Sequence, residues 1–111
     1  VALGHVEPVP SRRGELLGVT GLRGELLPVY GLARLLGLGD AGEARRWLVL
    51  AGGAARVGIA CGALEACRRV PAAAVEPARG ARGALQERAV LDGEAVPVAS
   101  VAALLREIGL S

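Results

Sequence analysis

The sequence is poor in the residue types from which most catalytic and metal sites are built. Its 111 residues include one His, two Cys, one Trp and one Tyr, and neither Met nor Phe. A structural zinc site needs four ligands, and His5, Cys61 and Cys67 provide three scattered candidates. We therefore expect no metal site and no cofactor. Both cysteines are expected to pack as small buried apolar groups in a reducing cytoplasm, although a disulfide between them stays open.

Membrane and nucleic-acid functions are also disfavoured by what is missing. Lys is absent, so all 13 basic residues are Arg, and the net charge is only +2. Nucleic-acid binding needs a concentrated basic face, often with aromatic side chains, and only Trp47 and Tyr30 could stack on bases. No apolar run approaches the ~18–20 residues that span a bilayer. The start, VALGHVEP, lacks a basic region followed by an apolar stretch, so we expect neither a signal peptide nor membrane insertion.

Catalytic groupings are equally hard to find. There is no Ser/His/acid set, no phosphate-binding glycine loop before a long helix, and no pocket of paired acids. Glu25 and Glu94 recur at matching places, but they flank predicted turns and face solvent. We expect a protein that is not an enzyme.

A repeat organises what is present. The stretch GVTGLRGELLPVYGLARLLGL (18–38) matches AVLDGEAVPVASVAALLREIGL (89–110) at an offset of 69 residues, and ALGHVEPVP (2–10) matches ALEACRRVP (63–71) at an offset of 61. The difference indicates a longer connection in the second copy, around VEPARGARG. Two anchors in the same order favour duplication over chance similarity, even in a chain rich in Ala, Leu, Val and Gly.

Short strands and helices are expected throughout the repeat. Period-two alternation and turn residues predict strands and hairpins over 2–10, 16–30, 45–51, 55–61, 64–70 and 85–99. The side chains expected to face the core are Leu27, Val29, Val96 and Val98. Leucine spacing predicts short helices after both hairpins, ended by Gly37 and Gly109.

The first copy is the shorter one. Nothing in it corresponds to 45–62, so we expect residues 1–44 to form a partial subdomain and 45–111 a fuller one. A sheet without those strands has an open edge. Either the missing strands lie upstream, or a partner covers the edge, or the first half leans on the second. Pro28 and Pro97 recur at one strand position, which suggests an edge or a bend.

At this point a family resemblance can be named. LLGVTGLRGELLPVYGLARLLGL resembles the segment of CheW-like coupling proteins that reads roughly GVxNLRGxxxPVxDLRxxLG, and the likeness continues through RWLVLAG, RVGIACGALEACRRVP and LDGEAVPVASVAALL. It implies an all-β fold with short helices, built as two SH3-like β-barrels of five strands each, of which the first is incomplete here. It also implies a cytoplasmic adaptor that joins chemoreceptor signalling tips to a CheA-type histidine kinase. Gly21 and Gly31 replace the family's Asn and Asp, which indicates an accessory form with weakened kinase binding.

Six residues of the first copy are candidates for partner binding: Arg23, Leu22, Gly24, Val19, Val6 and Val9. A guanidinium on a fixed turn can make bidentate bonds to a carboxylate. The alternative is a solvated turn residue, although Asp92 in the second copy shows that the turn does not require Arg. By resemblance, Val6 and Val9 lie on the strand that lines the receptor groove; the alternative is that they are core residues.

Two other functions stay open. The chain could be the regulatory module of a larger CheA-type kinase, which has the same fold by resemblance. It could also be a structural protein that forms a homodimer through its open first subdomain.

Overall fold

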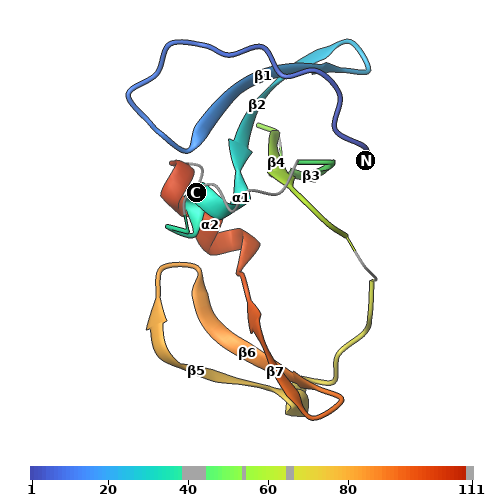
Figure 1. The fold of residues 1–111 in the computed structure, drawn as a ribbon, viewed down its shortest axis with the longest axis vertical. Coiled ribbons are helices and arrows are strands. Elements are labelled where there is room, and N and C mark those ends of the chain that lie inside the picture. Colours follow the sequence, from blue (N-terminus) through green and yellow to red (C-terminus); the bar gives the residue numbers. More distant parts are fainter. Residues whose placement is uncertain (39–44, 54, 65–66, 110–111) are drawn as a thin grey trace. The chain divides into compact units, whose positions relative to one another are not determined.

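The computed structural model describes residues 1–38, 45–53, 55–64 and 67–109, and strands predominate in it (Figure 1). The strands are β1 (Leu16–Leu22), β2 (Glu25–Gly31), β3 (Trp47–Ala51), β4 (Val57–Cys61), β5 (Val75–Arg82), β6 (Leu85–Leu91) and β7 (Glu94–Val98). The helices are α1 (Leu32–Leu35), α2 (Val101–Ile108) and the 3-10 turn η1 (Ala72–Ala74). The predicted all-β fold with short helices is confirmed. None of the helices in the described ranges is long and apolar enough to cross a membrane.

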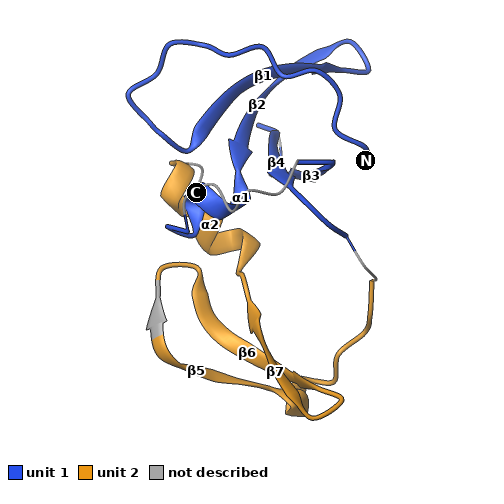
Figure 2. Cartoon of the chain, in the orientation of Figure 1, with its two compact units in different colours: residues 1–64 blue, residues 65–111 orange. Residues whose placement is uncertain are grey.

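The chain divides into two compact units, Val1–Leu64 and Glu65–Ser111 (Figure 2). The division predicted from the sequence falls between residues 44 and 45, so the two divisions differ by β3 and β4. These strands belong to the first unit because β4 runs parallel to β2, with Val29 opposite Gly58 and Tyr30 opposite Ile59. The strands that the first copy lacks are thus provided by the segment that follows it in the chain.

The first sheet has the order β1-β2-β4-β3, which leaves β1 and β3 at its edges. The amino-terminal segment reaches both edges, through isolated bridges from Ala2 to Trp47 and from Glu7 to Val19. It therefore joins β3 to β1 and completes a small, barrel-like ring of chain segments. The continuous strand predicted over 2–10 is reduced to these two bridges, since the segment pairs with a different strand at each end.

The interior of this ring is apolar and tightly packed. Its core cluster consists of Val29, Leu48 and Ala60, against which Leu3, Val6, Leu17 and Leu50 pack. Gly58 leaves room for this packing, because a Cβ at residue 58 would lie 2.6 Å from Leu48 Cδ1. Leu27 and Val29 are buried, as the alternation of β2 predicts.

The second sheet has the order β5-β6-β7 and differs most from expectation. Its first strand lies at 75–82, in the stretch that the sequence suggested to be a connection. The strand was not predicted because Pro77 obscures its alternation; its pairing with β6 is also irregular before Arg82. The strand predicted at 64–70 is wrong for the described residues 64 and 67–70, where the charged and exposed Arg68 and Arg69 have no strand to pair with. The prediction that Val96 faces the core is also wrong, since its side chain is 40% exposed.

The two hairpins share one geometry, as the repeat in the sequence predicts. Arg23 and Asp92 both have φ of 51°, and the glycines that follow them both have φ of 81°, as in a type I′ turn. Both ladders run in register for five pairs from these turns, and both prolines occupy the fourth residue after the turn. The transition from strand to helix also repeats. The Gly31 N–H donates to the Glu15 carbonyl, and the Ser100 N–H donates to the Ala84 carbonyl, each at 2.9 Å.

The helix that ends the second copy is capped at both ends. The Ser100 hydroxyl accepts a hydrogen bond from the Ala103 N–H at 3.2 Å. Gly109 closes the helix in the left-handed region with φ of 99°, as the sequence predicts. Ala103, Leu104 and Ile108 form its buried stripe.

The packing of Gly58 generates a stability prediction. Gly58→Ala forces Leu48 to move within a filled core, so we expect the free energy of unfolding to fall by about 1–3 kcal/mol. Gly21→Ala, in β1 with no atom within 4 Å of its added Cβ, is the matched control and should change stability by less than about 0.5 kcal/mol. Urea denaturation of both variants measures the difference. Equal stabilities would contradict the packing argument.

Candidate partner-binding surface

The tip of the β1–β2 hairpin presents an unengaged cation. Arg23 is exposed on a turn whose φ angles are fixed, and it makes no hydrogen bond or ion pair with any residue in the described ranges. The equivalent residue of the second hairpin, Asp92, is engaged, because its Oδ2 accepts a bond from Arg68 Nη1 at 3.3 Å. The same turn therefore carries opposite charges in the two units, and the negative one has a surface ion pair whereas the positive one has none among the described residues.

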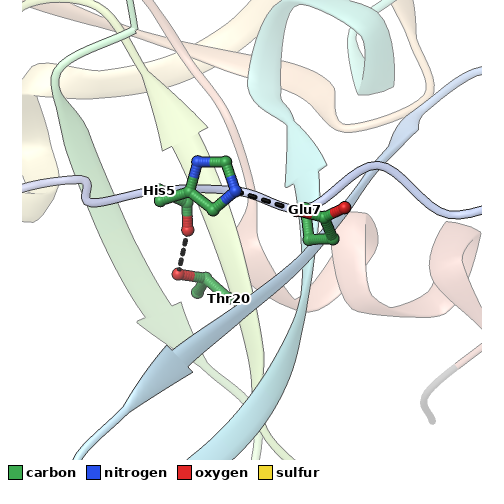
Figure 3. A network of polar contacts seen from close by, with 3 residues as sticks. All are labelled: His5, Glu7 and Thr20. Carbon is green, nitrogen blue, oxygen red and sulfur yellow. Dashed lines mark hydrogen bonds and ion pairs between the residues drawn. The ribbon is translucent and has the colours of Figure 1, made fainter.

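The amino-terminal segment is fastened to β1 close to this hairpin. The Glu7 N–H donates to the Val19 carbonyl at 2.8 Å, and the Val19 N–H donates back at 2.9 Å. Thr20, a buried polar residue, donates its hydroxyl to the His5 carbonyl at 2.7 Å (Figure 3). The exposed His5 and Glu7 side chains pair at 2.9 Å, which adds little, since surface ion pairs are weak.

Gly18 makes this close approach geometrically feasible. A Cβ at residue 18 would lie 2.1 Å from the Glu7 carbonyl oxygen, and the glycine has φ of 155°. Any other residue at position 18 would have to displace the backbone of Glu7 rather than the end of a flexible side chain. The GVTGLRG motif thus begins with a glycine that the amino-terminal segment requires.

The structure brings the six predicted residues into one unit but gives them different surroundings. Val6 packs against the core cluster, which agrees with the core alternative rather than with a groove contact. Val19 and Leu22 are half-buried along β1, and Val9 is half-buried beyond the Glu7 bridge. Only Arg23 and Gly24 are exposed at the tip. Partner binding by these residues stays a prediction.

Sequence reasoning missed the most exposed large apolar side chain of the hairpin. Leu26 is 78% exposed and lies opposite Gly21 in the ladder. It lines an open depression together with Glu25, Leu27, Gly53, Ala55 and Arg56. The signal was available, because Leu27 and Val29 face inward and the alternation of β2 therefore directs Leu26 outward.

The polar side chains of this surface suit contact with a protein partner rather than coordination of a metal ion. Within the described ranges, no three His, Cys, Asp or Glu side chains lie close enough to hold a metal ion. Arg56 and Glu25 line the same depression as Leu26, so an exposed apolar side chain lies among charged groups of both signs. A partner with an apolar residue beside charged groups of complementary sign would fit it.

The two cysteines differ from expectation. Both are free thiols, Cys61 half-buried and Cys67 exposed, so the prediction that Cys67 is buried is wrong. Burial raises the pKa of the Cys61 thiol, which lowers its thiolate fraction at neutral pH.

The contact at Gly18 can be tested by substitution. In Gly18→Ala the new methyl group collides with the Glu7 carbonyl, so the amino-terminal segment should leave β1. We expect the Glu7 and Val19 amides to exchange with solvent at least ~10-fold faster, as measured by NMR hydrogen exchange. Gly14→Ala, whose Cβ meets nothing within 4 Å, is the control. Unchanged exchange in Gly18→Ala would show that the segment does not depend on this approach.

The thiols give a second prediction. The thiolate is the reactive form, and burial both raises the pKa of Cys61 and shields it, so iodoacetamide should alkylate Cys67 at least ~10-fold faster near pH 7.5. Peptide mass spectrometry at timed intervals measures both rates. In denaturant the two rates should converge, and a difference that persists there would exclude burial as its cause.

Comparisons with known proteins agree with this geometry. A family model described as the CheW-like domain matches residues 1–109. Among solved structures, the chain is similar to the scaffolding protein TtCheW from Thermoanaerobacter tengcongensis, with a TM-score of 0.77 and 17% identity over 92% of this chain and 70% of that one. No curated protein matches the sequence. The family match spans both hairpins, both helices and the bridging amino-terminal segment, and it shows that the chain belongs to the CheW-like domain family.

Proposed function

We propose that this chain is a non-catalytic adaptor that couples chemoreceptors to a CheA-type histidine kinase in a bacterial chemosensory or motility pathway. The family match over residues 1–109 carries this proposal, because the family is one of coupling proteins. The structural relative is itself described as a scaffolding protein. Such a protein acts in the cytoplasm, where receptor signalling tips and the kinase meet.

The hairpin tip supports the receptor side of this role. Arg23 is held on a rigid turn with its guanidinium uncompensated, and Leu26 is exposed on the returning strand. An anchor of this kind combines an apolar contact with a charge-assisted hydrogen bond. It fits a helical receptor tip that presents carboxylates beside an apolar stripe.

The kinase side is proposed in a weaker form. Gly21 and Gly31 stand where the family pattern has Asn and Asp, so two side chains that could bond to a partner are missing. Gly21 is exposed on β1 and would offer only backbone there, whereas Gly31 is buried at the end of β2. An accessory coupling protein that keeps receptor binding and has reduced affinity for the kinase accounts for this pattern.

Of the other functions, a regulatory module of a larger CheA-type kinase would belong to the same family. The full open reading frame distinguishes it from a separate adaptor, because it shows whether a kinase core is encoded in the same chain. Self-association through an open first subdomain stays an alternative, although the amino-terminal segment contacts both edges of that sheet through isolated bridges.

Removal of the free guanidinium tests the adaptor function. Arg23→Ala should weaken binding to a receptor signalling-tip fragment about 10-fold, measured by isothermal titration calorimetry, since a charge-assisted bond is worth ~1.5–3 kcal/mol. Arg79→Ala, an exposed Arg of the second unit, is the matched control and should bind as the parent does. In parallel, the kinase regulatory domain should bind more weakly than the receptor fragment. Absence of binding to both fragments at ~100 μM would overturn the proposed function.

A further inference from the structure

Nothing within the chain requires the glycine at position 21. Gly21 lies in β1 without positive φ, and a Cβ at residue 21 would meet no atom within 4 Å. The glycines on either side of it are required, because Gly18 lies against the Glu7 backbone and Gly24 has φ of 81° in the turn. A glycine inside a strand weakens the strand and often marks a place where a ligand or another chain approaches closely. The reason for this glycine therefore has to be sought outside the hairpin.

The second hairpin shows that the same position tolerates a side chain. Val90 occupies the equivalent place in the repeat, in a ladder of the same register from a turn of the same conformation. Val90 pairs with Ala95 as Gly21 pairs with Leu26. In the second unit the larger residue of this cross-strand pair is on the first strand of the hairpin, and in the first unit it is on the returning strand. The hairpin geometry thus does not call for a glycine on the first strand.

Gly21 leaves a gap in an apolar strip on the outward face of the first hairpin. Alternate residues of a strand share a face, so Val19 lies on the same side as Gly21, and Pro28 on the same side as Leu26. Val19 and Pro28 are cross-strand partners and are both half-buried. Leu26 is 78% exposed, and the strand opposite it offers only backbone. The strip therefore has room for one large side chain beside Leu26.

The second hairpin has no such strip. The equivalent of Val19 is Arg88, whose Nε bonds to Glu76 Oε1 at 2.6 Å across the sheet. A charged pair therefore takes the place of an apolar residue on this face of the second unit. The combination of an apolar strip with a gap is confined to the hairpin that carries Arg23.

Arg23 indicates the charge that an occupant of the gap should carry. It is exposed in the turn, two residues beyond Gly21, and has no ion pair among the residues that the structure describes. Two residues of extended chain span at most about 7 Å. Side chains three or four positions apart on a helix lie ~5–6 Å apart at their Cβ atoms, so a helix can place an apolar side chain at Gly21 and a carboxylate at Arg23 together.

We propose that Gly21 is a specificity-determining residue, whose gap beside Leu26 takes a large apolar side chain from a helix of the receptor signalling tip. A carboxylate three or four positions away on that helix bonds to Arg23. This inference rests on the proposed coupling function and deepens its receptor side. An Asn at position 21, as in the family pattern, would fill the gap and cover Leu26, so the departure from that pattern favours a partner with a protruding apolar side chain.

Filling the gap is the direct test. Gly21→Asn should weaken binding of the full chain to a receptor signalling-tip fragment at least ~10-fold, measured by isothermal titration calorimetry, and Gly21→Ala should fall between this variant and the parent. Val90→Asn, the same side chain at the equivalent position of the second hairpin, is the matched control and should bind as the parent does. The urea midpoints of both Gly21 variants should equal that of the parent, because an added Cβ meets no atom of the chain. If Gly21→Asn does not fold, the affinity of Gly21→Ala decides.

A double variant tests whether Gly21 and Leu26 form one contact. Leu26→Ala alone should weaken binding of the same fragment about 5–10-fold. In Gly21→Asn/Leu26→Ala the two losses should not multiply, because both act on the same partner side chain. Full multiplication of the losses, or unchanged binding by Leu26→Ala, would show that no side chain is held between them.

The remaining outcomes separate this inference from the proposed function. If the parent binds the receptor fragment and Gly21→Asn binds it equally well or more tightly, the inference is overturned and the coupling function stands. An equal loss in Val90→Asn, or a loss of binding to the kinase regulatory domain in place of the receptor fragment, also overturns it. Absence of binding by the parent to both fragments at ~100 μM overturns the function and the inference together.

Discussion

The parallel pairing of β2 with β4 is the contact on which the rest of the first unit depends. It brings Val29 and Ala60 into one core and places β3 beside β4, where the amino-terminal segment can reach it. Without this pairing the first hairpin would be a two-stranded ribbon, which is marginally stable in water. The exposed surface at Arg23 and Leu26 therefore has a rigid base only because a distant segment supports the hairpin from its other side.

The two hairpins share one geometry but have unequal surroundings. Turn conformation, register and the hand-over to the helix repeat, because each depends on a few local residues. The outer edges of the hairpins differ, because β2 pairs there with β4, whereas β7 pairs only with β6 among the described residues. The tip residue also differs, since the turn requires positive φ at two positions but no particular charge.

Local features of the sequence were predictable and non-local ones were not. Turn glycines, alternation over Leu27 and Val29, and the Leu spacing of 101–108 were sufficient for both hairpins and for α2. The predicted division at 44/45 differs from the division into compact units because the latter depends on which strand β4 joins, and nothing near residues 57–61 indicates that pairing. β5 was missed because Pro77 and Gly80 disguise its alternation.

The candidate surface shows the same difference between local features, which were predictable, and non-local ones, which were not. Arg23 could be selected because a motif places it on a tight turn, and the structure gives it no partner among the described residues. The alternation of β2 predicts that Leu26 faces outward. The pairing adds that its cross-strand neighbour is Gly21, which has no side chain to cover it. Val6 was ambiguous in the sequence because an apolar residue on an extended segment can face a core or a partner. Its contact with the core cluster agrees with the core alternative, and the segment that carries it bonds to residues 19 and 46.

The order in which the first ring is joined has a consequence for synthesis of the chain. Its amino-terminal segment bonds to residues around 46–48, and β2 bonds to residues 58–60. On a ribosome, residues 1–38 can form the β1–β2 hairpin, but the outer edge of β2 stays without its neighbour until β4 has emerged from the exit tunnel. Contacts that join distant parts of a chain form slowly, so the open edge of β2 is available for wrong pairings during this interval.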